Sequence, residues 1–242
     1  MDPKSINFAA MPQTAIEIVT KPAEFFKGMP KTGGFTEPLV FAVMMGFIAG
    51  IIQAILGFIG LGHAGGYDGG MMGSFSVIII MPIAAVIGTF IGGAIFFLIW
   101  KLIGSQENYE TAFRCGAYLM ALSPITSVVG VVPYAGGLIT MAIYIFYMVT
   151  ASIHVHHIPA QKAWLVFGLI GLIVASIGLF SEYKIRHMAS SMDQWRQRGE
   201  EYRKSARDMG KSSEEIRKQA EKMVEQIKEQ AEDVKRQTER NR

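Results

Sequence analysis

The sequence has almost no charged side chains over two long stretches. Between residues 38 and 100 the only formally charged residue is Asp68, and between residues 115 and 181 it is Lys162. A soluble core does not contain apolar runs of this length, whereas about 20 apolar residues match the thickness of a bilayer. The scarcity of charge therefore excludes a soluble globular protein and predicts an integral membrane protein with several spans.

Cysteine is also scarce, since Cys115 is the only one in 242 residues. A single cysteine excludes an internal disulfide and a metal site built from cysteines. The sequence contains no Ser/His/Asp set, no paired catalytic carboxylates, no phosphate-binding loop and no nucleic-acid-binding module. We therefore expect a protein that is not an enzyme, binds no cofactor and has no nucleic-acid partner.

The apolar residues are gathered into five runs, so the sequence predicts an all-α integral membrane fold with five transmembrane helices. The expected spans are residues 38–62, 75–103, 113–132, 134–153 and 163–181. Pro82 predicts a kink or a strong tilt in the second span, and Pro133 predicts a tight hairpin. The chain then divides into an N-terminal segment (1–36), a five-span domain (37–182) and a charged tail (183–242).

The distribution of basic residues predicts the orientation, because cytoplasmic loops are enriched in Lys and Arg. Four lysines precede the first span, the loop after it has none, and the next loop has Lys101 and Arg114. We therefore expect a protein of the cell (inner) membrane with a cytoplasmic N-terminus. Five spans then place the tail on the outer side, although Lys184 and Arg186 directly follow the last span.

Two groups of residues are predicted to anchor the protein at the membrane surface. In the N-terminal segment, Phe25 and Phe26 can dip into the headgroup region from a short amphipathic helix, although an ordinary polar lead-in would have a similar sequence. Between the second and third spans, Lys101 and Arg114 can reach the headgroups, and Glu110 lies four residues before Arg114, at helical pairing distance. The lipid bilayer is thus the first expected partner.

The tail has a heptad pattern of apolar residues that predicts a long helix able to form a coiled coil. Twelve of sixteen a and d positions counted from Ile185 are apolar or aromatic, but Met and Ala dominate and Leu is absent. The predicted association residues are Ile216, Met223, Ile227 and Val234. A homo-oligomer or a partner helix would use this stripe, while a solvated single helix remains the alternative. Gly210 and a capping box at Ser212 leave a break near residues 210–213 open.

Two GxxxG pairs predict close helix packing: Gly46 with Gly50 in the first span, and Gly88 with Gly92 in the second. Glycines at this spacing let helix backbones approach closely in lipid, where van der Waals contact stabilises association. The pattern fits contacts within one chain and contacts between copies equally well.

Histidines suggest a metal site, since imidazole is a common zinc and copper ligand. His154, His156 and His157 lie too close in sequence to converge easily on one ion, so a polar cap at the end of the fourth span is the better interpretation. In the glycine-rich loop after the first span, His63 and Asp68 with two methionines are a weaker candidate for a soft metal, against an ordinary outer loop.

Four pieces of the sequence resemble, in order, the Yip family of five-span membrane proteins in its prokaryotic form. They are TKPAEFFKGMPKTGGFTEPLVFAVMMGFIAG (20–50), GSQENYETAFRCGAY (104–118), VPYAGG (132–137) and QKA (161–163). The resemblance implies five spans, a cytoplasmic N-terminus and no enzymatic activity. Eukaryotic members interact with Rab GTPases and act in vesicle traffic, but this chain has a short N-terminal segment and an additional charged tail, so GTPase binding is not carried over.

The sequence therefore predicts a non-enzymatic membrane-organising or scaffolding protein that oligomerises and recruits partners. The alternative is a transporter or channel for a small, uncharged solute, with a path lined by glycine and small hydroxyl residues. Ion-driven transport is less compatible with this sequence, because no ionisable residue lies in the middle of a predicted span.

Overall fold

The computed structural model describes residues 7–61 and 70–240 of the chain. Within the helices, side chains are described except at residues 70–74, 186–194, 196, 210–214, 216, 226, 227, 229–235 and 237–240. All regular structure in the described residues is helical, without a strand. The prediction of an all-helical fold is therefore confirmed for this part of the chain.

Five helical segments are long and apolar enough to cross a membrane, as the sequence predicts. They are Thr36–Phe58, Phe75–Leu102, Tyr109–Val129, Ala135–His154 and Ala160–Ile185. The first span is helix α3 (Thr36–Phe58), the second lies in α4 (Gly70–Leu102), the fourth is α7 (Ala135–His154) and the fifth begins α8 (Ala160–Arg240). Each lies within a few residues of its predicted bounds.

Prolines mark two of the irregular points. The third span consists of α5 (Tyr109–Leu119), the 3-10 turn η2 (Met120–Leu122) and α6 (Ser123–Val129), and Pro124 lies in the first turn of α6. Proline suits a first turn because its missing N–H would have no partner there. Pro82 lies inside α4, whereas Pro133 lies in the short turn between α6 and α7, where the hairpin is predicted.

The second span turns a row of apolar side chains outward. On α4 the side chains of Ile79, Ile83, Ile87, Ile91 and Ile95 are each more than half exposed and are spaced by four residues. Residues at this spacing lie on one helix face. Such a row would be costly in water but is the ordinary surface of a helix in lipid, so it supports the assignment of α4 as a membrane span.

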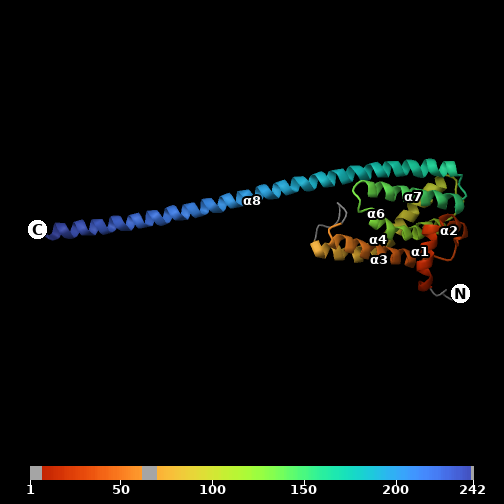
Figure 1. Cartoon of the computed structure of the whole chain (residues 1–242), viewed down its shortest axis with the longest axis horizontal. Coiled ribbons are helices and arrows are strands. Elements are labelled where there is room, and N and C mark those ends of the chain that lie inside the picture. Colours follow the sequence, from red (N-terminus) through yellow and green to blue (C-terminus); the bar gives the residue numbers. More distant parts are fainter. Residues whose placement is uncertain (1–6, 62–69, 241–242) are drawn as a thin grey trace. The chain divides into compact units, whose positions relative to one another are not determined.

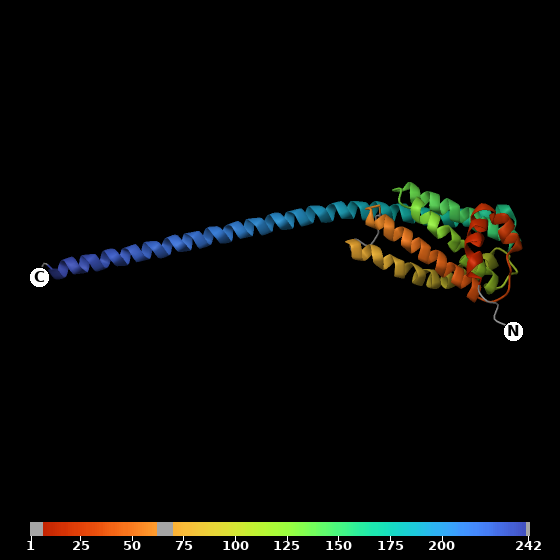
Figure 2. The same ribbon diagram turned by 60° about the horizontal axis from the view of Figure 1, so that its bottom comes forward.

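The N-terminal helices lie across one end of the bundle. After the 3-10 turn η1 (Phe8–Ala10), α1 (Met11–Thr20) contacts α5, and α2 (Pro22–Gly28) contacts α7 (Figures 1 and 2). Phe26 is 1% exposed, because it is packed inside the protein, and Phe25 stacks edge-on against Tyr118 at 5.1 Å. The two predicted headgroup anchors are therefore in contact with protein, whereas Ile16 on α1 is exposed.

Gly46 and Gly50 bring α3 against α4. A Cβ atom on Gly46 would lie 2.9 Å from Ala85 Cβ, and one on Gly50 would lie 3.0 Å from the Val77 carbonyl oxygen. Real Cβ atoms essentially never show the contact at Gly46, and the contact at Gly50 is tighter than nine in ten real ones, so a side chain at either position would press on α4. This GxxxG pair thus packs within one chain.

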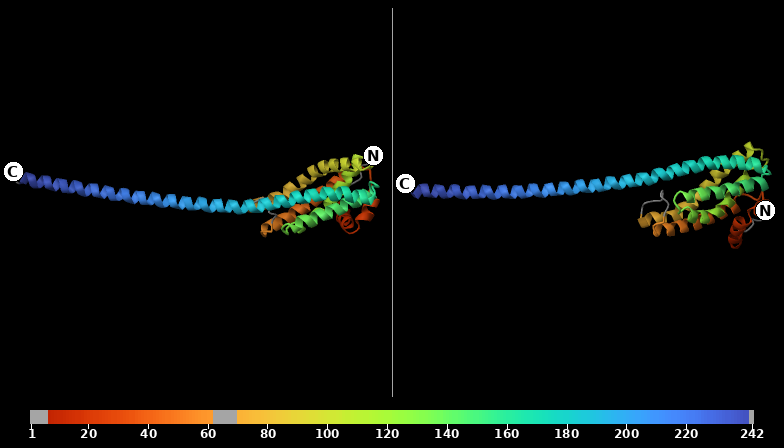
Figure 3. Two further views of the ribbon diagram at one scale, coloured as in Figure 1. Left: turned by 90° about the horizontal axis from the view of Figure 1, so that it is seen from above. Right: turned by 45° about the horizontal axis from the view of Figure 1, so that its top comes forward.

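The chain divides into two compact units, Met1–Ile185 and Arg186–Arg242. In the second unit the backbone is helical to Arg240, without a break at residues 210–213 (Figure 3). Met223 is exposed. The side chains of Ile216, Ile227 and Val234 lie outside the described ones, so coiled-coil association of the tail stays a prediction.

Candidate functional site

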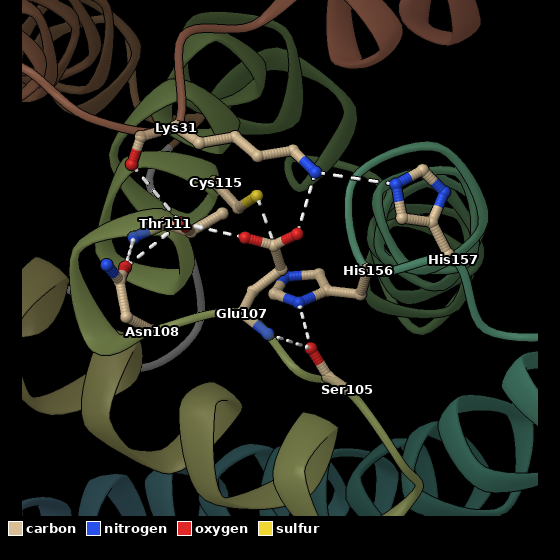
Figure 4. Close-up of polar contacts among 8 residues, drawn as sticks. All are labelled: Lys31, Ser105, Glu107, Asn108, Thr111, Cys115, His156 and His157. Atoms are coloured by element: carbon tan, nitrogen blue, oxygen red, sulfur yellow. Dashed lines mark hydrogen bonds and ion pairs between the residues drawn. The ribbon is translucent and has the colours of Figure 1, made fainter.

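Polar side chains gather at the end of the bundle that α1 and α2 cover. We call the following residues the polar cluster: Lys31, Ser105, Glu107, Asn108, Thr111, Cys115, His156 and His157 (Figure 4). They come from the segment between α2 and α3, the loop between α4 and α5, the first turns of α5, and the loop between α7 and α8. The loop before α5 and the first turns of α5 are continuous, so the cluster joins three parts of the sequence that are far apart: residue 31, residues 105–115 and residues 156–157.

An ion pair fastens the segment that precedes the first span. The Lys31 ammonium donates to Glu107 Oε1 at 2.7 Å and lies 3.4 Å from His157 Nε2. Both partners of the ion pair are partly exposed. The pair therefore fixes the position of the segment around Lys31 and adds little to the stability of the fold.

Asn108 and Thr111 begin α5 and hold the same segment. Asn108 is the N-cap, and its side-chain oxygen accepts the Thr111 backbone N–H at 2.9 Å. Asparagine suits this position because a helix start leaves its first N–H groups without helical partners. The Thr111 hydroxyl lies 3.0 Å from the Asn108 side-chain oxygen and 3.2 Å from the Lys31 carbonyl oxygen. The start of α5 thus also binds the backbone at residue 31.

Gly34 is clamped between an acid and a base of α5. Glu110 Oε1 accepts the Gly34 N–H at 2.7 Å, and the Arg114 guanidinium donates to the Gly34 carbonyl oxygen at 2.8 Å. Gly33 and Gly34 have φ angles of 125° and 84°, which only glycine adopts at little cost. The clamp therefore depends on both the glycines and the spacing of the charged pair.

Arg114 is not at the lipid surface as predicted. Its side chain is 1% exposed, and Glu37 lies 3.9 Å from its second terminal nitrogen. A guanidinium can be buried only where hydrogen-bond acceptors replace water. The carbonyl oxygen of Gly34 is such an acceptor. Gly34 lies 80 residues before Arg114, so helical periodicity could not indicate this contact.

His156 is the buried centre of the cluster. Its Nδ1 lies 2.7 Å from the Ser105 hydroxyl oxygen, and its Nε2 lies 3.9 Å from Cys115 Sγ. Burial, followed by the positive charges of Lys31, His157 and Lys101, lowers the pKa of His156 to about 3. The imidazole is therefore neutral at physiological pH.

Trp100 connects this histidine to the core. Its ring stacks on His156 with the ring centroids 3.8 Å apart, and its indole N–H donates to the Ser152 hydroxyl at 2.8 Å. The Trp100 side chain is completely buried. A ring that is stacked and hydrogen-bonded in this way fixes the end of α4 against α7.

The buried polar residues of the cluster bind one another. Ser105 and His156 form a hydrogen-bonded pair, and both are less than 5% exposed. No group of three or more potential metal ligands occurs among the described residues. His63 and Asp68, the weaker metal candidate, lie outside those residues.

The remaining predicted residues are placed elsewhere. Lys101 is the next-to-last residue of α4, and its side chain is exposed. Its ammonium lies 5.7 Å from the centroid of the Phe97 ring. His154 ends α7. Gly88 and Gly92 differ from the first glycine pair, because a Cβ atom on Gly88 would meet nothing within 4 Å and one on Gly92 would meet only the Phe96 ring, at 3.8 Å.

Gly88 and Gly92 line an apolar cavity of about 330 Å³ between α4, the third span, α7 and α8. The lining residues are Gly88, Thr89, Gly92, Gly93, Phe96, Gly116, Leu119, Met120, Met141, Tyr144, Ile145, Met148, Phe167, Ile170, Gly171 and Val174. The sequence pattern indicated helix packing for these glycines and gave no sign of a cavity, because the facing helices come from distant parts of the chain.

The membrane part of the chain is similar to a known protein family. A family model described as the Yip1 domain matches residues 16–181. No curated protein and no solved structure matches the chain. The matched residues include the second half of α1, all of α2, the polar cluster and the five candidate spans up to the last turn of the fifth.

Proposed function

The chain belongs to the Yip1 domain family, and on this premise we propose that it is a non-enzymatic multi-pass membrane scaffold that self-associates and recruits partners through its tail. The N-terminus then lies in the cytoplasm and the protein resides in the cell (inner) membrane, with the tail on the outer side. The five candidate spans support the membrane part of this proposal.

The observation that carries the proposal is a row of large exposed side chains in the tail. Trp195, Tyr202, Met209 and Met223 are 59–73% exposed. They are separated by one or two heptads, so they fall on one seam of a coiled coil. Burying such side chains stabilises an association by roughly 1.5–3 kcal/mol each.

The rest of the tail surface is strongly charged, which keeps a single helix soluble until it meets a partner. One ion pair joins Arg217 to Glu221 at 3.1 Å along the helix. Pairs at this spacing stabilise an exposed helix slightly and leave the apolar seam free. A second copy of the same tail is the simplest partner, because it presents an identical seam.

Size measurement of the full-length protein in nanodiscs or mild detergent tests the proposal. Tyr202→Glu together with Met209→Glu places charge on the seam and is expected to convert oligomers to monomers. Gln194→Glu together with Gln197→Glu adds the same two charges at heptad positions that face away from the seam and is the matched control. A wild-type protein that is monomeric at micromolar concentration, or a seam variant that still associates, would contradict self-association through the tail.

The polar cluster supports the scaffold in another way. Its buried Ser105 and His156 have no access for substrate, and its hydrogen bonds attach the N-terminal helices to the bundle end. A rigid end of this kind suits a protein whose surfaces bind other molecules. We therefore assign the cluster the role of positioning the N-terminal helices, and we assign it no catalytic role.

Transport of a small uncharged solute is the second candidate, because the cavity beside Gly88 and Gly92 lies within the spans. A liposome flux assay decides between the two. Solute-selective flux that is abolished by a bulky replacement at Gly88 would overturn the scaffold. The scaffold predicts no such flux for the wild type or the variant.

A further inference from the structure

The positions that flank the tail seam carry basic side chains. With Ile185 as heptad position a, Arg196, Arg203 and Arg217 fall at position e, and Arg198 falls at position g. No acidic residue falls at position e between residues 189 and 238. Charges at e and g meet across a coiled coil and set the orientation of its helices. Their distribution can therefore decide how two copies of the tail pair.

A parallel pair would bring like charges together. In this arrangement position g of one helix meets the position e that lies five residues further along its partner. Arg198 would thus meet Arg203 of a second copy, and symmetry would repeat the contact. Both side chains are exposed in the single tail. No position g from residue 191 to residue 233 has an opposite charge five residues further on, so nothing offsets this repulsion.

An antiparallel pair removes the repulsion. There position a meets position d of the partner, g meets g, and e meets e. In the register that places Met209 opposite Ala220 of a second copy, Arg198 meets Asp233 of that copy at position g. Symmetry gives this attractive contact twice, and no two like charges meet at e or g in this register. The charges therefore favour the antiparallel pair.

The same charges select one register. Sliding the two tails by one heptad in one direction places Arg203 against Arg217 of the second copy. Sliding them in the other direction places Arg198 against Arg240. Like charges at facing positions destabilise a pair. The register with Met209 opposite Ala220 is thus preferred over both of its neighbours.

Side-chain size along the seam agrees with this register. Met209 lies opposite Ala220, and Met223 lies opposite Ala206, so a large side chain meets a small one in each layer. All four side chains are exposed in the single tail and are free to pack. Large and small residues at facing positions let layers interdigitate without gaps. In a parallel pair each of these residues would meet its own copy, and Gly199 would lie opposite glycine.

The register also separates the membrane-attached ends of the two tails. It overlaps residues 192–237 of both copies, so the two Arg186 residues lie at opposite ends, about 80 Å apart at 1.5 Å per residue. Two copies in one bilayer could overlap in this way only if both tails ran along its surface. The faces outside the seam carry exposed charges such as Glu200, Glu201 and Asp208 and have no apolar stripe to lie on lipid. Copies in two facing bilayers can overlap without bending along a membrane.

We propose that the tail pairs in antiparallel orientation with the tail of a second copy in a facing bilayer, so that the protein holds two membranes about 80 Å apart. The five-span domain of each copy is the anchor. This proposal rests on the proposed self-association of the tail and adds the direction of pairing and the location of the partner.

Cross-linking of introduced thiols reads the orientation. Ala206→Cys and Met223→Cys are made as separate full-length proteins with different affinity tags, mixed in detergent and treated with a short bismaleimide. The antiparallel pair brings position 206 of one copy beside position 223 of the other, so we expect cross-links between the two variants and none within either. In a parallel pair these positions lie about 25 Å apart, and each variant would cross-link with itself. Cys115 is buried and adds little background.

The outcomes separate the direction of pairing from self-association itself. Cross-links within each variant, without cross-links between them, would overturn the antiparallel pair and leave self-association standing. A monomeric wild type, with cross-links in none of the samples, would overturn both. The wild-type size measurement needs no variant, so a misfolded cysteine variant does not prevent this distinction.

Reversing one charge has opposite effects in the two arrangements. In the antiparallel pair, Arg198→Asp faces Asp233 and is expected to raise the dissociation constant roughly tenfold. In a parallel pair it would face Arg203 and lower the dissociation constant. Arg198→Asp combined with Asp233→Arg restores the attraction and should recover the wild-type value. Arg207→Asp makes the same charge change at a position that faces away from the seam and is the matched control. Tighter association of Arg198→Asp than of the wild type would overturn the proposal.

Clustering of vesicles tests the location of the partner. Phosphatidylcholine vesicles that carry the full-length protein are expected to cluster in dynamic light scattering and to leave protein-free vesicles dispersed. Vesicles that carry Tyr202→Glu with Met209→Glu should stay dispersed. Electron cryomicroscopy of the clusters is expected to show facing bilayers about 80 Å apart. Wild-type vesicles that stay dispersed, although the mixed cysteine variants cross-link, would place both copies in one bilayer and overturn the proposal.

Discussion

Lys31 and Glu107 form a 2.7 Å ion pair between residues that are 76 positions apart in the sequence. The pair joins the segment before the first span to the loop before the third span. It therefore links the N-terminal helices to the bundle at a point that no local pattern could indicate.

Exchanging the two charges tests this pair. Lys31→Glu or Glu107→Lys alone is expected to loosen the segment at residues 29–35, because each places like charges together. A partly exposed pair contributes about 0.2–1 kcal/mol, so amide hydrogen exchange in this segment should accelerate about two- to fivefold. The double variant is expected to recover most of the protection. Two single variants with unchanged exchange would show that the pair does not hold the segment.

Replacing Arg114 tests the clamp on Gly34. Arg114→Met is expected to lower the free energy of unfolding by about 2 kcal/mol, because the Gly34 carbonyl oxygen then loses its donor and Glu37 loses its basic neighbour. Thermal unfolding in detergent measures the change. Arg217→Met, at an exposed position of the tail, is the control and should have little effect. Equal melting temperatures for the Arg114 variant and the wild type would contradict the clamp.

His156 predicts how stability depends on pH. In the folded protein its pKa is about 3, whereas in the unfolded chain it returns to the usual 6.5, so between these values only the unfolded state binds the proton. Stability is therefore complete above pH 6.5 and falls as the pH decreases below it. From pH 7.5 to pH 5 the wild type should lose about 2 kcal/mol through this residue.

The matched variant for this pH effect is His156→Gln, which cannot bind the proton. Its unfolding free energy should change less between pH 7.5 and pH 5 than that of the wild type. His154→Gln leaves the buried ring of His156 in place, so the unfolding free energy of this control variant should depend on pH as in the wild type. If the His156 variant and the wild type show the same pH dependence, the ring is already protonated or accessible in the folded state.

Adding a methyl group to Gly50 tests the contact between α3 and α4. Its Cβ atom would lie 3.0–3.1 Å from backbone atoms of Val77 and Ile78, which cannot move aside as a flexible side chain can. Gly50→Ala should destabilise the protein by about 1–3 kcal/mol in detergent. Gly178→Ala, where the space is open, should be neutral or slightly stabilising because alanine favours helix. Equal unfolding temperatures for both variants would contradict close packing at Gly50.

Labelling of an introduced thiol determines the side of the tail. Met223 is exposed, and the only natural cysteine, Cys115, is buried, so Met223→Cys gives one reactive site. With the tail on the outer side, a membrane-impermeant maleimide should label Met223→Cys in intact cells. Labelling that requires permeabilisation would place the tail in the cytoplasm and contradict the proposed orientation. The unsubstituted protein is the control for background reaction.

The spans were predictable from the sequence because lipid contact imposes a local requirement, a continuous apolar run. The Pro133 turn followed from the same pattern. The polar cluster was not predictable, because Trp100, Ser105 and His156 meet through folding and not through spacing. The concentration of polar residues at 104–111, beside a span end, is the only local signal that could have indicated this site.

Charged residues of α5 and the histidines after α7 have partners that sequence spacing did not indicate, for one physical reason. Helical spacing placed Glu110 beside Arg114, but each binds a different polar group of Gly34. The histidines were predicted to form a polar cap at the end of the fourth span, and His156 lies directly after that span but is buried against Trp100. In both cases a segment distant in sequence covers the span end and replaces water or lipid as the partner.

The clamp on Gly34 also sets an order of events during synthesis. The ribosome completes residues 31–34 long before Glu107, Glu110 and Arg114, which are needed to bind them, exist. At about 5–20 residues per second this interval lasts about 4–15 s. For that time the amino-terminal helices have no docking surface on the third span, so the bundle end can be completed only after a third hydrophobic segment has been inserted.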